Sequence, residues 1–236
     1  MTSTTAWNLT IFDDVLPEVY LGAAYGVFRE LVISSGLFYV SVDSLKADSA
    51  ASALSAYLPH AVAAFVSEHL MRVATICPPD LMNRGDGFEF WVGVTAAGGT
   101  TVRLHVDNDE VLRARSGQVE TPLFGSILHL GPQRGLVGGE TMFDLGYGTR
   151  NEADHPRFVE RSLEEVLAHA VAPVVIPQRA GRLILFRGDI PHAVAPVRAC
   201  EDDQPRVALL ANLWQARITA VPAVVTATSI ATSDPP

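Results

Sequence analysis

The chain has 236 residues, 48% of them apolar and 18% charged, which is enough to bury the core of one domain. Its formal net charge of −9 argues against nucleic acid or an anionic membrane as the main partner, because an acidic surface repels phosphate groups. No apolar stretch approaches the roughly 18 uncharged residues that a membrane helix needs. No basic start followed by an apolar run suggests a secretory signal, so we expect a cytoplasmic protein, whose oligomeric state the sequence does not specify.

Two helical segments are predicted before the first strand. Over residues 13–32 the apolar residues fall near helical spacing, after an N-terminal cap at Asp14. Residues 44–75 form an alanine-rich segment with apolar residues on one side, which Pro59 is expected to kink or split. The sequence therefore predicts a helical part over about residues 1–80.

From Phe88 onward, short segments rich in β-branched and aromatic residues alternate with Gly, Pro, Asn and Asp, which is typical of strands and turns. Many short strands after a helical part predict an α+β, mostly β, fold. Its core, about residues 86–217, is expected to be a double-stranded β-helix, or jelly roll, with the N-terminal helices packed on one face.

Residues 148–170 interrupt this strand pattern, and we expect a polar loop followed by a short helix over about residues 162–169. Residues 79–87 and the loop 148–160 flank the expected mouth of the jelly roll and are candidate lids. Residues 218–236 are expected to trail from the domain. The whole chain is thus predicted to form a single domain.

His105 and Asp107 lie two residues apart in the strand-like sequence TVRLHVD. Residues i and i+2 of a strand face the same side, so the imidazole and the carboxylate can converge on one ion. With a third ligand they would form the two-histidine, one-carboxylate facial triad, which leaves positions open on iron(II). About 0.4 such pairs are expected by chance, so the pair alone fits a turn-forming aspartate equally well. Asp109 and Glu110 are expected to shape the following loop.

A third ligand and a basic residue follow further along the chain. In GRLILFRGDIPHAVAPV, His192 comes after a strand that reads as buried and a Gly-Asp turn. Fourteen residues later, Arg206 opens the strand RVALLANLW. An arginine at the mouth of a barrel strand is costly to bury unless it meets an anion, and a carboxylate bound through two hydrogen bonds is its best partner.

The order of His-x-Asp, a distal histidine and an arginine on the last core strand resembles that of the iron(II)- and 2-oxoglutarate-dependent oxygenase superfamily. The local sequence is most similar to the prolyl-hydroxylase-like branch. In that branch a strand, a Gly-rich hairpin and a second strand lead into HVDN, as in GVTAAGGTTVRLHVDND here. The segments SILHLGPQRGLVGGET and HAVAP also resemble elements of that branch. The resemblance covers roughly residues 86–217.

This resemblance implies that His105, Asp107 and His192 bind iron(II). It also implies that Arg206 binds the distal carboxylate of the cosubstrate 2-oxoglutarate. Arg198, six residues after His192, is the competing candidate. It heads an acidic loop, whereas Arg206 opens a clear strand, and we therefore favour Arg206.

Further site residues follow from the resemblance and from strand alternation. His129 and Thr95 lie where relatives often place tyrosines that contact 2-oxoglutarate, and both depart from the family in residue type. Counting alternate residues from Arg206 places Asn212 and Trp214 on the same face of the strand. Both are candidates to line the substrate pocket, although core packing explains Trp214 at least as well.

The resemblance implies a dioxygenase that uses O2 and converts 2-oxoglutarate to succinate while it oxidises a C–H bond. Asp107 favours hydroxylation over halogenation, because halogenating relatives carry a small residue in place of this ligand. We expect a small-molecule substrate, such as an amino acid or a natural-product intermediate. The alternatives are a peptidyl prolyl hydroxylase, a metal-dependent jelly-roll isomerase or binding protein that uses no oxygen, and a non-catalytic β-sandwich.

Overall fold

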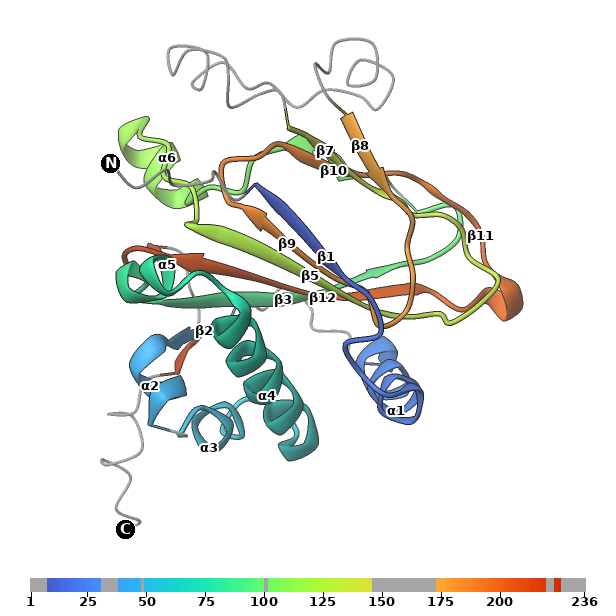
Figure 1. Cartoon of the computed structure of the whole chain (residues 1–236), viewed down its shortest axis with the longest axis horizontal. Coiled ribbons are helices and arrows are strands. Elements are labelled where there is room, and N and C mark those ends of the chain that lie inside the picture. The colour runs from blue at the N-terminus through green and yellow to red at the C-terminus, as the bar shows by residue number, and fades with distance from the viewer. Residues whose placement is uncertain are drawn as a thin grey trace.

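The computed structural model describes residues 8–30, 38–47, 49–99, 102–145, 173–219 and 223–225. Two β-sheets lie one above the other, and helices cover the outer face of the larger sheet (Figure 1). The fold is the predicted jelly roll with helices on one face, and its two sheets do not close into a barrel. The predicted loop 148–160 and the predicted helix 162–169 lie outside the described residues.

The strands of the described part are short and span most of the chain. They are β1 (Leu9–Phe12), β2 (Phe38–Ser41), β3 (Gly87–Thr95), β4 (Val102–His105), β5 (Phe124–Gly131), β6 (Val137–Gly138), β7 (Thr141–Asp144), β8 (Pro173–Ile176), β9 (Leu183–Arg187), β10 (His192–Val194), β11 (Val197–Ala199), β12 (Arg206–Trp214) and β13 (Ala223–Val225).

Within these residues, the larger sheet has seven strands in the order β1-β9-β5-β12-β3-β2-β13. The smaller sheet has four strands in the order β4-β10-β7-β8, and β11 pairs separately with β6. The pairs are antiparallel except that β13 runs parallel to β2. Strand β12 therefore lies in the middle of the larger sheet, with β3 on one side and β5 on the other.

Most helices come from the N-terminal part of the chain, as predicted. Helices α1 to α4 lie on the side of the larger sheet that faces away from β7, β8 and β10 (Figure 1). The helices are α1 (Glu18–Glu30), α2 (Val42–Lys46), α3 (Ala50–Leu54), α4 (His60–Ile76), α5 (Pro79–Arg84) and α6 (Glu110–Ser116), with a 3-10 turn, η3 (Glu201–Asp203).

Several expectations about these elements were wrong. Asp14 does not cap α1, because it adopts a positive φ of 55° and the helix starts only after Pro17. The residues before it form β1, an edge strand that the sequence did not reveal. Pro59 does separate the alanine-rich segment, but the part before it is itself two helices, since α2 ends at Lys46 and α3 begins at Ala50. Residues 223–225, expected to trail, pair with β2.

Two segments that were expected to be loops contain short helices. Helix α5 has a proline in its first turn, where the missing N–H costs no hydrogen bond. Helix α6 follows β4 closely and is capped by Asp109, whose carboxylate accepts a hydrogen bond from the Leu112 N–H at 2.9 Å. Gly117 ends α6 with a φ of 73°. The other carboxylate oxygen of Asp109 accepts from the Thr219 N–H at 2.6 Å, which ties α6 to the chain after β12.

Alternation along the strands divides the side chains of the larger sheet between two hydrophobic clusters. Leu128 belongs to the cluster on the helix side, together with Leu70 of α4. Its neighbour Ile127 belongs to the cluster between the two sheets, together with Phe143 of β7 and Ala208 of β12. Because successive residues of a strand face opposite sides, the face of β12 that carries Ala208 looks towards the smaller sheet.

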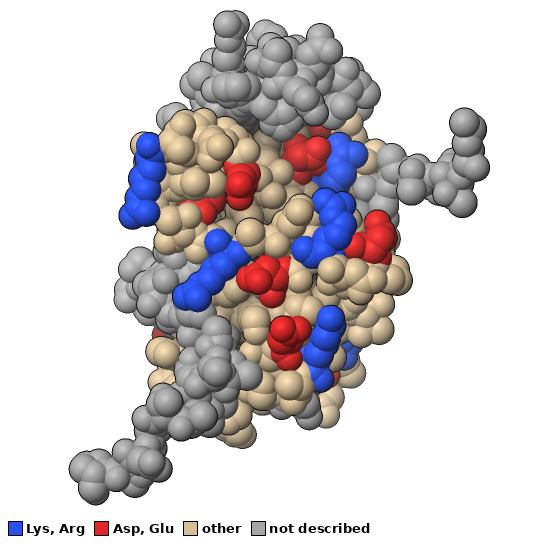
Figure 2. Space-filling view, turned by 90° about the vertical axis from the view of Figure 1, so that its left-hand side faces the viewer, with Lys and Arg blue, Asp and Glu red and all other residues tan. Residues whose placement is uncertain are grey.

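The surface mixes both signs of charge. Acidic and basic side chains are interspersed over the face shown in Figure 2. Two of the ion pairs join Arg113 to Glu110 and Arg182 to Asp13, each at 2.6 Å. This mixture differs from the clustered positive charge that binds phosphate backbones. No helix of the described part is both long and apolar enough to cross a membrane.

Helix α4 buries a histidine without a hydrogen-bond partner for its Nε2 among the described residues. His69 is 5% exposed and lines a pocket of about 250 Å³ together with Leu16 and Phe65. Burial and the nearby charge of Arg72 lower the pKa of His69 to about 3. The ring is therefore neutral at pH 7, as a buried imidazole without an acidic partner should be.

We predict that this buried imidazole destabilises the fold in acid. The unfolded chain takes up the His69 proton near pH 6.5, but the folded chain takes it up only near pH 3. Between these values the free energy of unfolding should fall by about 1.4 kcal/mol per pH unit through this group. Between about pH 6 and pH 4.5, the free energy of unfolding measured with urea should fall less steeply for His69→Leu than for the wild type. His60→Leu, at an exposed position of the same helix, should keep the wild-type slope, and equal slopes for all three proteins would contradict the prediction.

Candidate metal centre

Three potential metal ligands meet on one side of the smaller sheet. His105 is the last residue of β4, Asp107 follows two residues later, and His192 is the first residue of β10. The antiparallel pairing of β4 with β10 places His105 directly opposite His192. Asp107 Oδ1 lies 3.3 Å from His105 Nε2, and Asp107 Oδ2 lies 3.6 Å from His192 Nε2. One ligand atom from each residue lies within 4.8 Å of the others, which is close enough for the three to hold one ion.

The backbone selects the tautomer of His192. Its Nδ1 lies 3.2 Å from the carbonyl oxygen of Ile190. A carbonyl oxygen only accepts hydrogen bonds, so Nδ1 carries a proton, and Nε2 is the nitrogen that faces Asp107. The imidazole also packs against Phe186, with ring centroids 4.8 Å apart. Both contacts hold the ring in the state and orientation that a metal ligand needs.

The charge states of the three residues also suit a cation. Burial lowers the pKa of His192, as does the neighbouring His105, and Asp107 opposes this shift. Burial by itself raises the pKa of Asp107, but the His192 charge and the hydrogen bond from His105 hold it at about 2. Asp107 is therefore ionised at neutral pH, and burial favours the neutral form of His192. This donor set fits iron(II), which binds imidazole and carboxylate ligands in facial triads.

A buried basic residue lies on the inward face of β12. Arg206 is 3% exposed, and its Nε and Nη2 have no hydrogen-bond partner within the described residues. Burial lowers the pKa of Arg206 to about 10, so the guanidinium still carries its charge at neutral pH. A desolvated cation with free donors is costly, and an anion such as a carboxylate would offset that cost. Arg198, the competing arginine, is exposed on β11.

His129 and Thr95 flank this arginine. Thr95 pairs directly with Arg206 across β3 and β12, and His129 of β5 pairs with Ala208. His129 is fully buried, and neither ring nitrogen has a hydrogen-bond partner within the part of the chain that the structure describes. Burial and the Arg206 charge lower the pKa of His129 well below its usual range, so its ring is neutral. The neutral imidazole provides a second hydrogen-bonding group near the buried guanidinium.

Asn212 and Trp214 are buried, and their polar side chains bond within the protein. Asn212 donates from Nδ2 to Asp107 Oδ2 at 3.1 Å. Trp214 packs with Tyr39 and Ile218, and its Nε1 donates to a carboxylate oxygen of Glu89 at 2.9 Å. Asn212 therefore supports the candidate metal ligand Asp107, and Trp214 is part of the core.

Glu89 is a residue of this region that the sequence analysis missed. It lies on β3 opposite Asn212 and is 7% exposed. Burial raises the pKa of Glu89 to about 7, and the Asp107 charge adds to the rise, whereas hydrogen bonds from Trp214 and Asn212 oppose it. A single glutamate among the aromatic residues of FEFWVGVT was the only signal in the sequence, and it does not reveal a partner.

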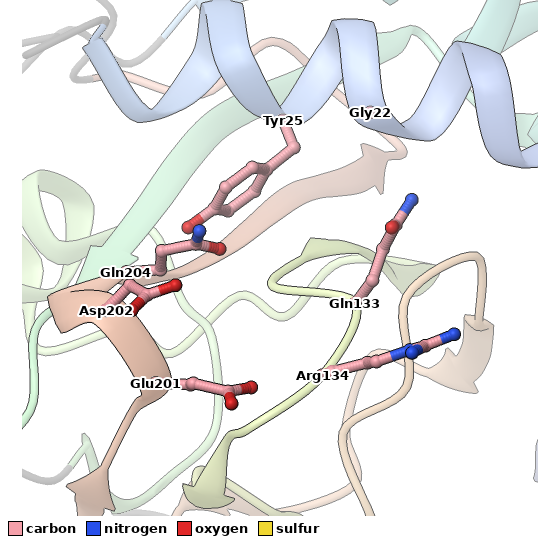
Figure 3. Close-up of a pocket in the computed structure, with 7 residues that line it drawn as sticks. All are labelled: Gly22, Tyr25, Gln133, Arg134, Glu201, Asp202 and Gln204. Atoms are coloured by element: carbon pink, nitrogen blue, oxygen red, sulfur yellow. The ribbon is translucent and has the colours of Figure 1, made fainter.

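A polar surface pocket of about 220 Å³ lies near the start of β12. Figure 3 shows Tyr25 of α1 and Gln204 on one side, with Gln133 and Arg134 on the other. None of its lining residues belongs to the ligand cluster. The Tyr25 hydroxyl donates to the carbonyl oxygen of Pro205 at 2.9 Å. This wall of the pocket therefore anchors the backbone immediately before Arg206.

We predict that Arg206 destabilises the ligand-free fold. Arg206→Met keeps much of the side-chain volume but removes the buried charge, so the free energy of unfolding should rise by about 1–3 kcal/mol. Chemical denaturation of the purified chain, without added metal or 2-oxoglutarate, measures this change. The matched control Arg198→Met removes an exposed arginine and should change the value by less than about 0.5 kcal/mol. A loss of stability in Arg206→Met would show that the arginine already has a stabilising partner.

No protein-family model matches the chain, and no curated protein sequence does so either. Among solved structures, a prolyl 4-hydroxylase from Pseudomonas putida is 14% identical, with a TM-score of 0.53 over 89% of this chain and 86% of its own. A prolyl hydroxylase from Trichoplax adhaerens, in complex with a hypoxia inducible factor peptide, is 13% identical, with a TM-score of 0.55 over 89% and 84%.

EvdO2 from Micromonospora carbonacea var. aurantiaca, in complex with 2-oxoglutarate, is 14% identical to this chain. Its TM-score is 0.53, over 88% of this chain and 86% of its own. These likenesses extend over nearly the whole chain, helices and sheets together. The chain therefore has the fold of the prolyl-hydroxylase-like branch of the iron(II)- and 2-oxoglutarate-dependent oxygenases, as its sequence predicted.

Proposed function

We propose that the chain is an iron(II)- and 2-oxoglutarate-dependent dioxygenase that hydroxylates a C–H bond of a small molecule. The observation that carries this proposal is a His-Asp-His cluster beside strand β12, which also presents a buried arginine that meets no anion among the described residues. A jelly-roll isomerase or binding protein would account for the cluster but has no need of Arg206. A cosubstrate with a 2-oxo acid group at one end and a carboxylate at the other accounts for both the cluster and the arginine.

In this proposal His105, Asp107 and His192 hold iron(II), and their number leaves coordination positions for other ligands. The bound metal would couple the reduction of O2 and the decarboxylation of 2-oxoglutarate to oxidation of the substrate. Arg206 binds the distal carboxylate through its free Nε and Nη2 donors. His129 and Thr95, which flank Arg206, contribute further contacts to the same carboxylate.

Strand β12 carries residues from both parts of the proposed site. Arg206 begins the strand, and Asn212, which contacts Asp107, lies six residues later on the same face. The strand is hydrogen-bonded on both sides, so the two ends cannot move independently. A rigid element of this kind orients a cosubstrate without the loss of conformational entropy that ordering a mobile site on binding would cause.

The substrate class is part of the proposal. A carboxylate at position 107 supports hydroxylation over halogenation by the resemblance described above. On the face shown in Figure 2, the acidic and basic side chains of the described residues are interspersed and form no broad region of one sign that would bind a charged polymer, which supports a small molecule. The similar Trichoplax structure contains a peptide, so peptidyl prolyl hydroxylation is the second candidate. Succinate formation stimulated by proline-containing peptides, and not by free amino acids, would favour that candidate.

The first test concerns the metal and the cosubstrate together. Anaerobic addition of iron(II) and 2-oxoglutarate to the apoprotein should produce the visible charge-transfer absorption of an iron-chelated 2-oxo acid. His192→Ala should lose the band because one ligand is missing, and His60→Ala, at an exposed position on α4, should keep it. Iron binding without the band in the wild type would leave a metal site but favour the isomerase or binding-protein alternative.

The second test concerns the arginine. Arg206→Met should weaken 2-oxoglutarate binding by about 10- to 100-fold, because a hydrogen bond to a charged group contributes about 1.5–3 kcal/mol. Titration of the iron-loaded protein, followed by the same absorption band, measures the dissociation constant. Arg198→Met should bind 2-oxoglutarate as the wild type does. The reverse result, with the loss only in Arg198→Met, would transfer the role to Arg198.

A further inference from the structure

A buried polar cluster lies beside the proposed metal ligands, and its acidic member has no role assigned so far. It consists of Glu89 on β3 with Asn212 and Trp214 on β12, which we call the Glu89 cluster. In the antiparallel register Asn212 lies directly opposite Glu89, and Trp214 lies opposite Gly87. Directly opposed residues of two strands have neighbouring side chains on the same face of the sheet. The cluster is therefore built by the pairing of β3 with β12.

One hydrogen bond joins this cluster to Asp107, a proposed metal ligand. Trp214 Nε1 donates to Glu89 Oε2 at 2.9 Å, and both side chains are buried. Asn212 Nδ2 donates to Asp107 Oδ2 at 3.1 Å. The Asn212 side chain lies directly opposite Glu89 in the register, and its amide acts to lower the pKa of the Glu89 carboxyl group. One amide group thus lies between a carboxylate that belongs to the ligand cluster and a carboxylate that does not.

This position determines how the amide is turned. An asparagine side chain has an NH2 group that only donates and an oxygen that only accepts. An ionised carboxylate only accepts, so above the Glu89 pKa of about 7 an amide between the two carboxylates is stable with its NH2 group towards them and unstable when flipped. Glu89 and Asp107 together therefore favour the orientation in which Asn212 donates to Asp107. Trp214 in turn holds Glu89 in place.

We propose that Glu89 is a positioning residue, which fixes the amide of Asn212 and through it the orientation of the Asp107 carboxylate. This inference rests on the proposed function, since it concerns a carboxylate assigned to the metal. A purely structural role would be filled as well by glutamine, which can also accept a hydrogen bond from Trp214. Glutamine would, however, offer an NH2 group of its own, which attracts the Asn212 oxygen and so favours the flipped amide.

The experiment measures iron(II) binding to the apoprotein by anaerobic calorimetry, independently of any turnover. Glu89→Gln should weaken iron(II) binding by about 10-fold, the lower end of the range for partners that orient metal ligands. Asn212→Ala should weaken it by at least as much. If Glu89 acts through Asn212, Glu89→Gln should cause no further loss in the Asn212→Ala background, which a double-mutant cycle tests.

A matched control separates positioning from general destabilisation. Ser126 is buried on β5, and its hydroxyl donates to the carbonyl oxygen of Ala211, the residue before Asn212, at 3.1 Å. Ser126→Ala removes this buried hydrogen bond on the opposite face of the sheet. It should lower the midpoint of thermal unfolding and leave the iron(II) dissociation constant unchanged.

The outcomes are distinguishable. Wild-type iron(II) affinity in a folded Glu89→Gln protein, or losses that add in the double variant, would overturn the inference and leave the proposed function standing. Absence of iron(II) binding by the wild type would overturn both. If Glu89→Gln does not fold, Trp214→Phe releases Glu89 while keeping an aromatic ring in the core. This variant should weaken iron(II) binding several-fold, and unchanged affinity would again overturn the inference.

Discussion

The register between β12 and its two neighbours is the constraint on which the site depends. Strand β12 pairs along its whole length with β3 and over most of it with β5. That register places Arg206 beside Thr95 and Asn212 beside Glu89, all on the face that looks towards the smaller sheet. A slip of β12 by one residue would turn Arg206 and Asn212 towards the helices and bring Val207 or Leu213 inward instead. The polar groups of the site and the apolar packing of the helices are therefore fixed by the same hydrogen bonds.

The jelly roll and the nearness of the metal ligands were predictable because their signals are local or carried by an ordered motif. A histidine and an aspartate two apart on a strand share a face wherever that strand lies, and the resemblance supplied the partner His192. The edge strands β1 and β13 were not predictable, because short strands form only where a neighbour offers a free edge. Glu89 was missed for a related reason. Its meaning lies in the pairing with Asn212, 123 residues away in the sequence, and no local pattern encodes that pairing.

The site holds polar groups at a cost that the rest of the fold must offset. Arg206 and His129 are buried without hydrogen-bond partners for several of their nitrogens within the described residues. Glu89 is a buried acid beside a second acid. Residues that break the rules of burial in this way tend to mark functional sites. Here two large hydrophobic clusters, one on each face of the larger sheet, provide the stability that makes such residues tolerable.

The hydrogen bond from Tyr25 to Pro205 connects the helical layer with the strand that carries Arg206. The Tyr25 ring also lies where a side chain at Gly131 would stand, so α1 is seated against the end of β5 as well. The helix that covers the outside of the sheet therefore determines where the first residue of β12 sits. Substitutions on α1 can therefore change the position of Arg206 from outside the site. A change on α1 that shifts Tyr25 would alter the position of Arg206, and with it the proposed binding of 2-oxoglutarate, without altering any residue of the inner face.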